Sequence, residues 1–194
     1  NSENVKERIA RLYGRPARVV PAPVDTSFYL PAASPRRREG LLVVSALVPY
    51  KRLEDAIGAS GRLGLPLTIA GFGPEEARLR ALAGPNVRFA GSPSDEELRE
   101  LYRSAELVLM PGEEDFGIVP LEAQACGAPV VALGRGGALD PHQAGVGVID
   151  CYVAIRQGRR LVSLRNSGAL GDDRMLQRVG PMSVDEPDPN AVDG

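Results

Sequence analysis

The sequence predicts an α/β protein built on a doubly wound, Rossmann-like parallel sheet. Three observations lead to this prediction. Short apolar runs of strand length recur along the chain, and they lack the polar–apolar alternation of a half-exposed strand. Segments with the apolar spacing of an amphipathic helix separate these runs. Strands buried on both faces and joined by helices form parallel sheets with right-handed crossovers, so this order favours a sheet covered on both sides.

The first expected element is a helix over residues 3–13. Three apolar residues recur at helical spacing and would share one face: Val5, Ile9 and Leu12. Ser2 is suited to cap the start of this helix, and Gly14 is suited to end it. An extended connector broken by two prolines follows at 17–25. Residues 31–40 form a polar loop rich in Pro and Arg, and Arg36 to Arg38 within it are expected to be solvated.

Five strands are expected from the apolar runs at 41–47, 67–71, 87–91, 107–112 and 129–134. Helices are expected between them. One has Leu53 on its apolar face, and one is opened by Pro74, because proline is tolerated at a first-turn position. A third covers 94–106, where Ser94 and Glu97 have the spacing of a capping box.

The alternation of strands and helices ends near residue 140. The runs 146–155 and 158–165 each favour a strand, and the acidic, Pro-rich end at 184–194 is expected to be disordered. Because the rhythm is lost at one point, we expect residues 141–194 to be a truncated, rearranged or frame-shifted end.

Composition argues against several classes of function. The 194 residues carry a net charge of −2, so no basic field indicates nucleic acid as a partner. No apolar run approaches the length of a membrane span. The two cysteines, Cys126 and Cys151, suggest neither a disulfide framework nor a thiolate metal site, and they fit a reducing, cytoplasmic compartment. A single histidine, His142, argues against a histidine metal site or a catalytic triad.

The loops that follow the expected strands carry the candidate site. In an open parallel sheet, ligands bind beyond the carboxyl ends of the strands. Four loops would meet there, with the sequences VPYKR (48–52), GFGP (71–74), PGEEDFG (111–117) and GRGG (134–137). They would bring cations, glycine backbone and carboxylates together. The dinucleotide pattern GxGxxG and the P-loop pattern are both missing, so those two readings lack their fingerprints.

A helix start is predicted within EEDFGIVPLE (113–122). Proline is tolerated only in the first turn of a helix, so Pro120 places the start near Phe116 to Gly117. The first amides of this helix, at Gly117, Ile118 and Val119, would then point into the cleft.

Two carboxylates flank this helix start. Glu114 lies just before it, and Glu122 lies roughly 8 Å further along at ~1.5 Å per residue. A ligand with phosphate at its middle and hydroxyl groups at both ends suits this arrangement, and a nucleotide-sugar has that layout.

The spacing of Glu114 and Glu122 resembles the E-x7-E motif of retaining GT-B glycosyltransferases of family 4, also called glycosyl transferases group 1. Four further segments are similar in the same order: SALVPYKRLEDAI, IAGFGPEEARLR, VRFAGSPSDEELRELYRSAELVLMP and EAQACGAPVVA. NSENVKERIARLYG followed by PAPVD resembles the hinge segment that enters the C-terminal domain. VPYKR together with EEDFGIVPLEAQACG looks most like the mannosyltransferase-type members.

This resemblance implies the C-terminal, donor-binding half of a GT-B fold. Residues 1–24 would be a hinge helix and connector from a missing N-terminal domain, 25–140 the Rossmann-like domain that binds the nucleotide-sugar, and 141–194 a divergent tail. The family's first domain, with the acceptor site and a catalytic histidine, has no counterpart here. We therefore expect little or no transferase activity from this chain alone.

The resemblance also implies a role for each matched residue. Glu114 would contact the transferred sugar and support the transition state, while Glu122 would hold the ribose hydroxyls. Lys51 would bind the diphosphate with help from Arg52. The backbone near the phosphates would come from Phe116, Gly117 and Ile118. Gly71 and Gly73 would lie beside the donor, and the base would lie near Arg88, Phe89 and Gly91.

The implied reaction transfers a hexose, with mannose as the leading candidate, from GDP-mannose or a UDP-sugar. The acceptor would be a glycan or a lipid-linked molecule, the anomeric configuration would be retained, and neither a metal ion nor another cofactor would be essential. The full enzyme would be cytoplasmic, and the resemblance allows peripheral association with the inner face of the membrane.

Two departures from the family keep other readings open. Ala46 stands where the family commonly has Arg, and Asp140 stands where it usually has Glu. A non-catalytic nucleotide-sugar binding module or a degenerate remnant is one alternative, and another Rossmann-type enzyme such as an epimerase or methyltransferase is the second. Taken singly, Lys51, Glu114 and Glu122 also fit ordinary solvated positions near helix ends.

Overall fold

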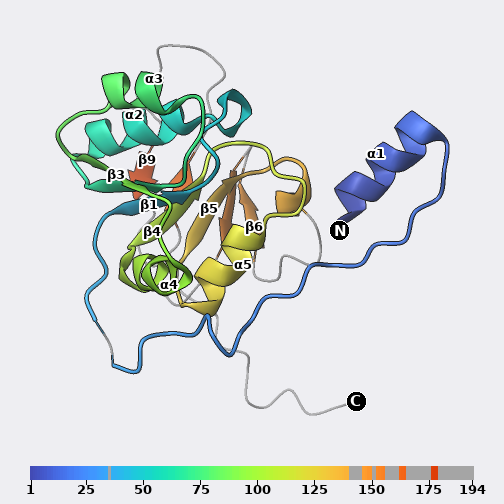
Figure 1. The fold of residues 1–194 in the computed structure, drawn as a ribbon, viewed down its shortest axis with the longest axis horizontal. Coiled ribbons are helices and arrows are strands. Elements are labelled where there is room, and N and C mark those ends of the chain that lie inside the picture. The colour runs from blue at the N-terminus through green and yellow to red at the C-terminus, as the bar shows by residue number, and fades with distance from the viewer. Residues whose placement is uncertain (35, 140–145, 150–151, 156–161, 165–175, 179–194) are drawn as a thin grey trace, which may run out of the picture.

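The computed structural model describes residues 1–34, 36–139, 146–149, 152–155, 162–164 and 176–178. It confirms the predicted α/β class. Seven strands form one sheet in the order β3-β2-β1-β4-β5-β7-β6, and helices cover both faces of its parallel part (Figure 1). Sequence-adjacent strands run outward from β1 on one side and β4 on the other, which is the doubly wound arrangement.

The five parallel strands coincide with the five predicted runs. They are β1 Leu41–Val44, β2 Leu67–Ala70, β3 Val87–Gly91, β4 Leu107–Met110 and β5 Val130–Leu133. The central strand β1 pairs with β2 and with β4, and Leu41 lies opposite both Leu67 and Leu107. Strands buried on both faces need apolar side chains at successive positions, and this is why their sequences show no alternation.

The helices are α1 Glu3–Tyr13, α2 Leu53–Leu63, α3 Glu76–Leu82, α4 Asp95–Ser104 and α5 Ile118–Ala125, with short 3-10 helices η1 Pro49–Lys51 and η2 Gly137–Leu139. The predicted caps are confirmed. The Ser2 hydroxyl accepts from the Val5 amide, and Ser94 forms a capping box with Glu97. The predicted start at Pro74 is wrong, since α3 begins at Glu76. The Glu75 amide donates instead to the Leu47 carbonyl at 3.0 Å, so this turn first docks on another loop.

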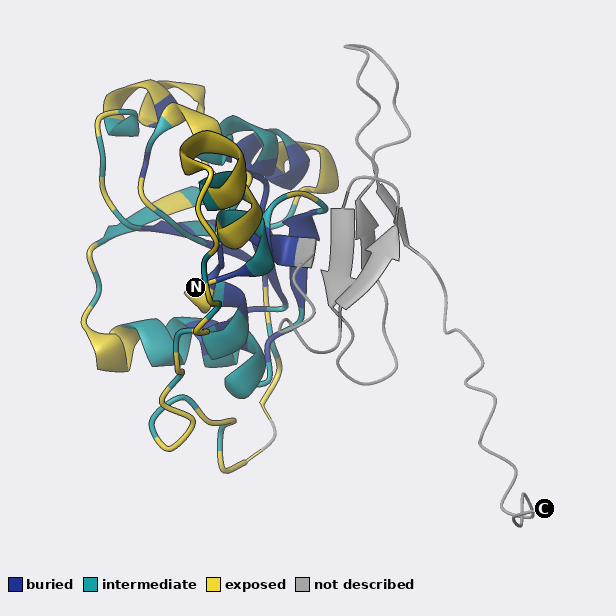
Figure 2. Ribbon diagram, turned by 90° about the vertical axis from the view of Figure 1, so that its right-hand side faces the viewer, coloured by how far each residue is buried: buried dark blue, intermediate teal, exposed yellow. Residues whose placement is uncertain are grey.

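Two hydrophobic clusters lie on opposite faces of the sheet. Leu53, Ile57 and Leu79 from α2 and α3 pack on one face. Tyr102 from α4 and Ala123 from α5 pack on the other. Figure 2 shows the buried residues concentrated along the sheet between these layers. The carboxyl ends of the strands therefore form one edge, with the helix starts beside it.

Arg38 departs from the prediction of a solvated loop. Its guanidinium donates to the carbonyls of Tyr102 at 2.9 Å, Ala105 at 3.3 Å and Cys126 at 2.9 Å. These carbonyls close the last turns of α4 and α5, where a cation is favoured. Burial lowers the pKa of Arg38. Its neighbour Arg37 does remain in solvent, with 88% of its side chain exposed.

Beyond residue 139 the backbone differs from the single strand predicted at 146–155. That run forms two antiparallel strands, β6 Val146–Ile149 and β7 Tyr152–Ile155, and β7 pairs with β5. β8 Val162–Leu164 lies within the second predicted run and pairs with β9 Leu176–Arg178. His142, Asp140 and the end predicted to be disordered lie outside the described residues. In the described part of the chain, no helix has the length and apolar character needed to cross a membrane.

Candidate functional site

The four loops that were expected to meet do so at the carboxyl edge of the sheet. The Leu47 amide donates to the Phe72 carbonyl at 3.0 Å, which joins the loops after β1 and β2. The Gly137 amide donates to the Glu114 carbonyl at 2.5 Å, which joins the loops after β5 and β4. A Cβ added at Gly112 would lie 2.5 Å from Lys51 Cα, so the loops after β4 and β1 also touch.

Lys51 and Glu114 form an ion pair at this edge. Lys51 Nζ lies 2.7 Å from Glu114 Oε2, and the two side chains are only 12% and 27% exposed. Lys51 ends η1, and its ammonium lies 5.0 Å from the centroid of the Tyr50 ring. A pair this far withdrawn from water interacts more strongly than one on the open surface. Lys51 is therefore not a freely solvated helix-start residue.

Arg52 plays a different part from Lys51. Its backbone has a φ of 53°, the left-handed conformation, and it ends η1 and precedes α2. Its guanidinium lies 2.6 Å from Asp55 Oδ2, three residues along the same helix. The structure therefore joins Arg52 to α2, whereas Lys51 reaches across to the loop after β4.

The start of α5 lies where Pro120 places it. Gly117 is the residue before the helix and has a φ of 81°, and Pro120 occupies the third helical position. The positive φ favours glycine at this position, and a Cβ there would lie 3.2 Å from Glu114 Cγ, a tight contact with that side chain. Phe116 is buried beneath this turn, while Ile118 is 41% exposed. The positive end of α5 is thus set next to Glu114.

Glu122 lies in a separate contact on the same helix. The Tyr102 hydroxyl donates to Glu122 Oε2 at 2.9 Å, and this bond joins α5 to α4. Burial raises the pKa of Glu122, and hydrogen bonds from Tyr102 and Tyr29 oppose the rise. The structure therefore pairs the two predicted glutamates with different partners, Glu114 with Lys51 and Glu122 with Tyr102.

Gly71 and Gly73 serve the packing of one loop on another. A Cβ at Gly71 would lie 1.9 Å from the Ser45 carbonyl oxygen, and one at Gly73 would lie 2.4 Å from the Leu47 carbonyl oxygen. The close approach that these glycines permit is made by the loop after β1.

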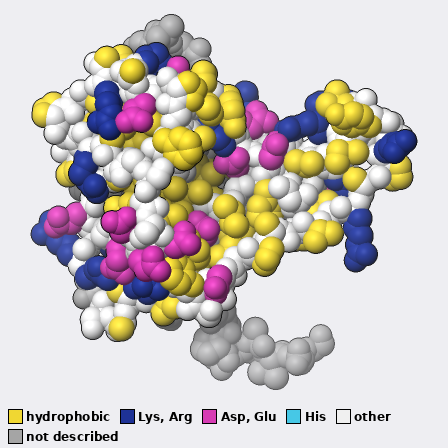
Figure 3. All heavy atoms as spheres, in the orientation of Figure 1, with side chains coloured by type: hydrophobic (Ala, Val, Ile, Leu, Met, Phe, Trp, Pro, Cys, Tyr) yellow, Lys and Arg dark blue, Asp and Glu magenta, His cyan; other side chains and the backbone are white. Residues whose placement is uncertain are grey.

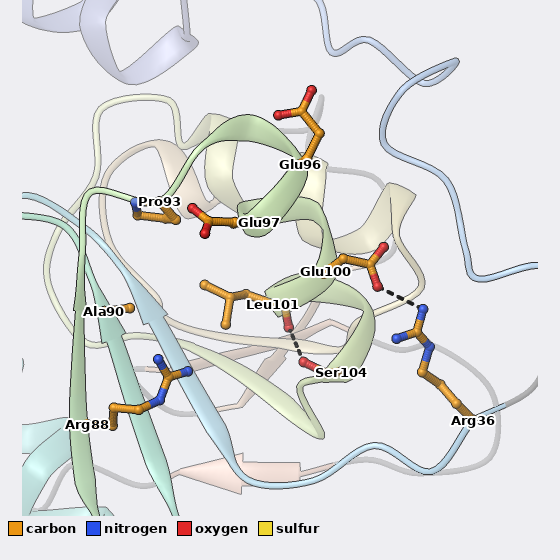
Figure 4. A pocket seen from close by; sticks show the side chains of 9 residues that line it. All are labelled: Arg36, Arg88, Ala90, Pro93, Glu96, Glu97, Glu100, Leu101 and Ser104. Atoms are coloured by element: carbon orange, nitrogen blue, oxygen red, sulfur yellow. Dashed lines mark hydrogen bonds and ion pairs between the residues drawn. The ribbon is translucent and has the colours of Figure 1, made fainter.

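The structure does not bring Arg88 and Phe89 together. They alternate along β3, so their side chains lie on opposite faces of the sheet. Phe89 packs with the α2 and α3 side and lies 4.4 Å from the Arg80 guanidinium. Arg88 donates to Thr68 Oγ1 at 3.2 Å and lines a pocket of about 520 Å³ between β3 and α4 (Figure 4). Gly91, whose carbonyl accepts from the Gly71 amide at 2.6 Å, lies nearer the edge.

No pattern in the sequence indicates that α1 reaches the candidate site. The buried Ser2 hydroxyl donates to the Asp115 carbonyl at 2.5 Å, and the Asp115 carboxylate accepts from Arg8 and from Asn4. Asp115 directly follows Glu114, so α1 braces the same loop from its other side. The C-terminal end of α1 projects away from the sheet and its covering helices, and it exposes the hydrophobic side chains of Leu12 and Tyr13 (Figure 3). In the described residues, no group of three or more His, Cys, Asp or Glu side chains gathers as a metal site would require.

Replacing Glu122 by glutamine should raise the stability of the fold at neutral pH. A carboxyl group whose pKa is raised on folding favours the native state below its ordinary pKa of 4.5, and that contribution is lost as the pH rises through the folded value. Glutamine has no charge to bury and retains an oxygen that accepts from Tyr102. Urea midpoints should therefore be higher for Glu122→Gln at pH 7, and the difference should shrink towards pH 4. The exposed Glu7→Gln is the control, and a lower midpoint for Glu122→Gln at pH 7 would contradict this expectation.

Comparison with known proteins places this geometry in a family. The family model described as glycosyl transferases group 1 matches residues 31–151. A D-inositol 3-phosphate glycosyltransferase of Acidothermus cellulolyticus is 36% identical in an alignment of 170 positions that covers 71% of this chain and 38% of that protein. A GDP-mannose-dependent alpha-mannosyltransferase of Corynebacterium glutamicum is 38% identical over 104 residues, which cover 53% of this chain and 25% of that protein.

Solved structures share the fold. Anabaena HepE in complex with UDP-glucose superposes with a TM-score of 0.64 at 24% identity, over 72% of this chain and 45% of that one. Sucrose-phosphate synthase from Thermosynechococcus elongatus superposes with a TM-score of 0.61 at 23% identity, over 71% and 40%. The chain thus spans less than half the length of each of these relatives. With the family model matching more than half of its residues, the chain belongs to the glycosyl transferases group 1 family.

Proposed function

We propose that this chain carries the donor site of a glycosyltransferase that transfers a hexose from a nucleotide-diphosphate sugar with retention of configuration. The observation that carries the proposal is the partly buried pair of Lys51 and Glu114, held 2.7 Å apart beside the start of α5. A cation and a helix N-terminus both bind the negatively charged diphosphate. A carboxylate at the same point stabilises the positive charge that develops on the sugar in the transition state.

Each residue of the pair has a defined role in this proposal. Lys51 Nζ exchanges its contact with Glu114 for the diphosphate and stabilises the charge that develops on it as the leaving group. Glu114 then faces the transferred sugar and stabilises its transition state. Arg52 supports η1 through its bond to Asp55. Gly117 lets the backbone turn tightly between Glu114 and the first amides of α5.

Glu122 supplies the contact to the nucleoside. It lies one turn into α5, and its half-buried carboxylate accepts a hydrogen bond from the Tyr102 hydroxyl at 2.9 Å. A carboxylate accepts hydrogen bonds from paired hydroxyls, which ribose offers. The base of the nucleotide would bind near Gly91, where β3 ends at this same edge of the sheet. Arg88 lies away from that position, in the pocket between β3 and α4.

The donor and acceptor are proposed from the relatives. GDP-mannose is the first donor to test, because one relative is named as dependent on it, and UDP-sugars are the second, because HepE was solved with UDP-glucose. The acceptor is a glycan or a lipid-linked molecule. The chain spans less than half the length of these relatives, and we expect little or no transferase activity from it alone.

A second candidate function is a nucleotide-sugar binding module without catalysis. Ala46 favours this candidate. It lies on the loop after β1, where the family commonly has Arg, so one cation that could contact the diphosphate is missing. Donor binding without turnover, even after an N-terminal domain is supplied, would support this candidate over the transferase.

Calorimetric titration of the chain with GDP and with UDP tests the proposal. We expect one nucleotide to bind more tightly, and Glu122→Ala to weaken that binding by about tenfold, which is the value of one charge-assisted hydrogen bond. Glu7→Ala, an exposed glutamate on α1, should bind as the wild type does. If neither GDP nor UDP binds, the donor-site proposal is overturned.

A further inference from the structure

We propose that Tyr102 is a positioning residue of the donor site, which holds the Glu122 carboxylate in the orientation that accepts the ribose hydroxyls. This inference rests on the proposed function, because it concerns the same carboxylate. It adds a residue from α4, twenty positions before Glu122 in the chain, to a site so far built from the loops and the start of α5.

The contact is short and shielded from water. Tyr102 is fully buried, and its hydroxyl donates to Glu122 Oε2 at 2.9 Å. A hydrogen bond to a carboxylate from a buried donor is stronger than one between neutral groups. Because the ring is packed in the core under α4 and α5, it cannot turn away from Glu122 without opening that core.

Tyr102 is itself supported by the segment before the sheet. Its ring lies edge-on to Tyr29, with 6.0 Å between centroids. Two arginines of α4 hold the segment that carries Tyr29. The Arg99 guanidinium lies 4.3 Å from the centroid of the Phe28 ring, and Arg103 Nε donates to the Leu30 carbonyl at 2.8 Å. The two phenols are therefore in place before any ligand binds, which lowers the entropy cost of binding.

The Tyr102 bond leaves Glu122 able to accept further bonds. A carboxylate has about four lone-pair sites, and the Tyr102 hydroxyl uses one of them. The Tyr102 bond also opposes the rise that burial causes in the pKa of Glu122. Its loss would favour the protonated form of the carboxyl group, which has fewer acceptor sites.

The experiment compares ribonucleotides with analogues that lack the ribose hydroxyls. Tyr102→Phe keeps the ring and removes only the hydroxyl, and UDP and GDP are titrated beside their 2′,3′-dideoxy forms. We expect Tyr102→Phe to weaken binding of the preferred ribonucleotide about five- to tenfold. Binding of the dideoxy form should stay as in the wild type, so the discrimination between the two falls by the same factor. Tyr13→Phe, on the exposed end of α1, should change neither affinity.

The outcomes separate this inference from the proposed function. If the wild type binds ribonucleotide and dideoxynucleotide equally, the ribose contact of Glu122 fails and this inference fails with it. If the wild type discriminates and Tyr102→Phe retains the full discrimination, only this inference is wrong. A second measurement is the carboxyl ¹³C shift of Glu122 against pH, which should report a higher pKa in Tyr102→Phe than in the wild type. An unchanged pKa would also overturn the inference.

Discussion

Replacing Lys51 by methionine should weaken the binding of a nucleoside diphosphate by about 10- to 100-fold, as expected for the loss of a charged partner. The ammonium is the cation that the structure places beside Glu114 and the start of α5, and methionine keeps most of its length without the charge. The nucleoside without phosphates should bind both proteins equally, because Lys51 contacts only the diphosphate in the proposed site. Calorimetry with UDP, GDP, uridine and guanosine measures the difference directly.

The sequence offers a matched control for this substitution. Lys6 is the only other lysine, and it lies on α1 with its side chain 45% exposed and paired with Glu3. Lys6→Met should bind every ligand as the wild type does. Equal losses for nucleoside and diphosphate in Lys51→Met would indicate damage to the loops rather than to a phosphate contact. No loss at all would remove Lys51 from the donor site.

Replacing Gly71 by alanine should destabilise the fold by roughly 3 kcal/mol or more, the range in which overpacking and backbone strain act together. The added Cβ would lie 1.9 Å from the Ser45 carbonyl oxygen, and that neighbour is backbone, which has little room to move. Gly71 also has a φ of 129°, a backbone conformation that residues other than glycine rarely adopt. Urea unfolding at pH 7 should show a large fall in midpoint, or no cooperative transition.

Gly61→Ala is the control for Gly71→Ala. Gly61 lies in α2, and a Cβ there would meet nothing within 4 Å. Alanine should therefore stabilise the helix by up to about 1 kcal/mol. The same chemical change is thus expected to act in opposite directions at the two positions. A Gly71→Ala protein as stable as the wild type would mean that the loops after β1 and β2 are not in close contact.

The positions of the candidate site residues could be predicted from sequence more readily than their contacts, and the reason is physical. Pro120 located the start of α5 from sequence, because a proline constrains the few residues around it. Glu114 and Lys51 were both singled out, but their pairing depends on two loops 63 residues apart that only the sheet brings together. The close approach of Gly71 to the Ser45 carbonyl likewise depends on two loops that the sheet brings together.

Arg38 and Asp115 illustrate what local patterns cannot reveal. Arg38 stands in a run of three arginines, and nothing in that run distinguishes it from the exposed Arg37. Its burial follows from the C-termini of α4 and α5, which converge on it from distant parts of the chain. Asp115 is one acid among three in EED, and its bonds to Ser2 and Arg8, at the start of α1, arise only because the chain folds back.

The sequence by itself determined the α/β class, the five parallel strands, the helix caps and the spacing of the two glutamates. Each of these depends on residues a few positions apart, where hydrophobic period, capping side chains and proline act within one element. Tertiary structure alone decided that Glu114 pairs with Lys51, that Glu122 is held by the buried Tyr102, and that α1 reaches the loop beside them. These contacts join side chains from separate elements, so they exist only once the sheet has set the distance, burial and orientation of each partner.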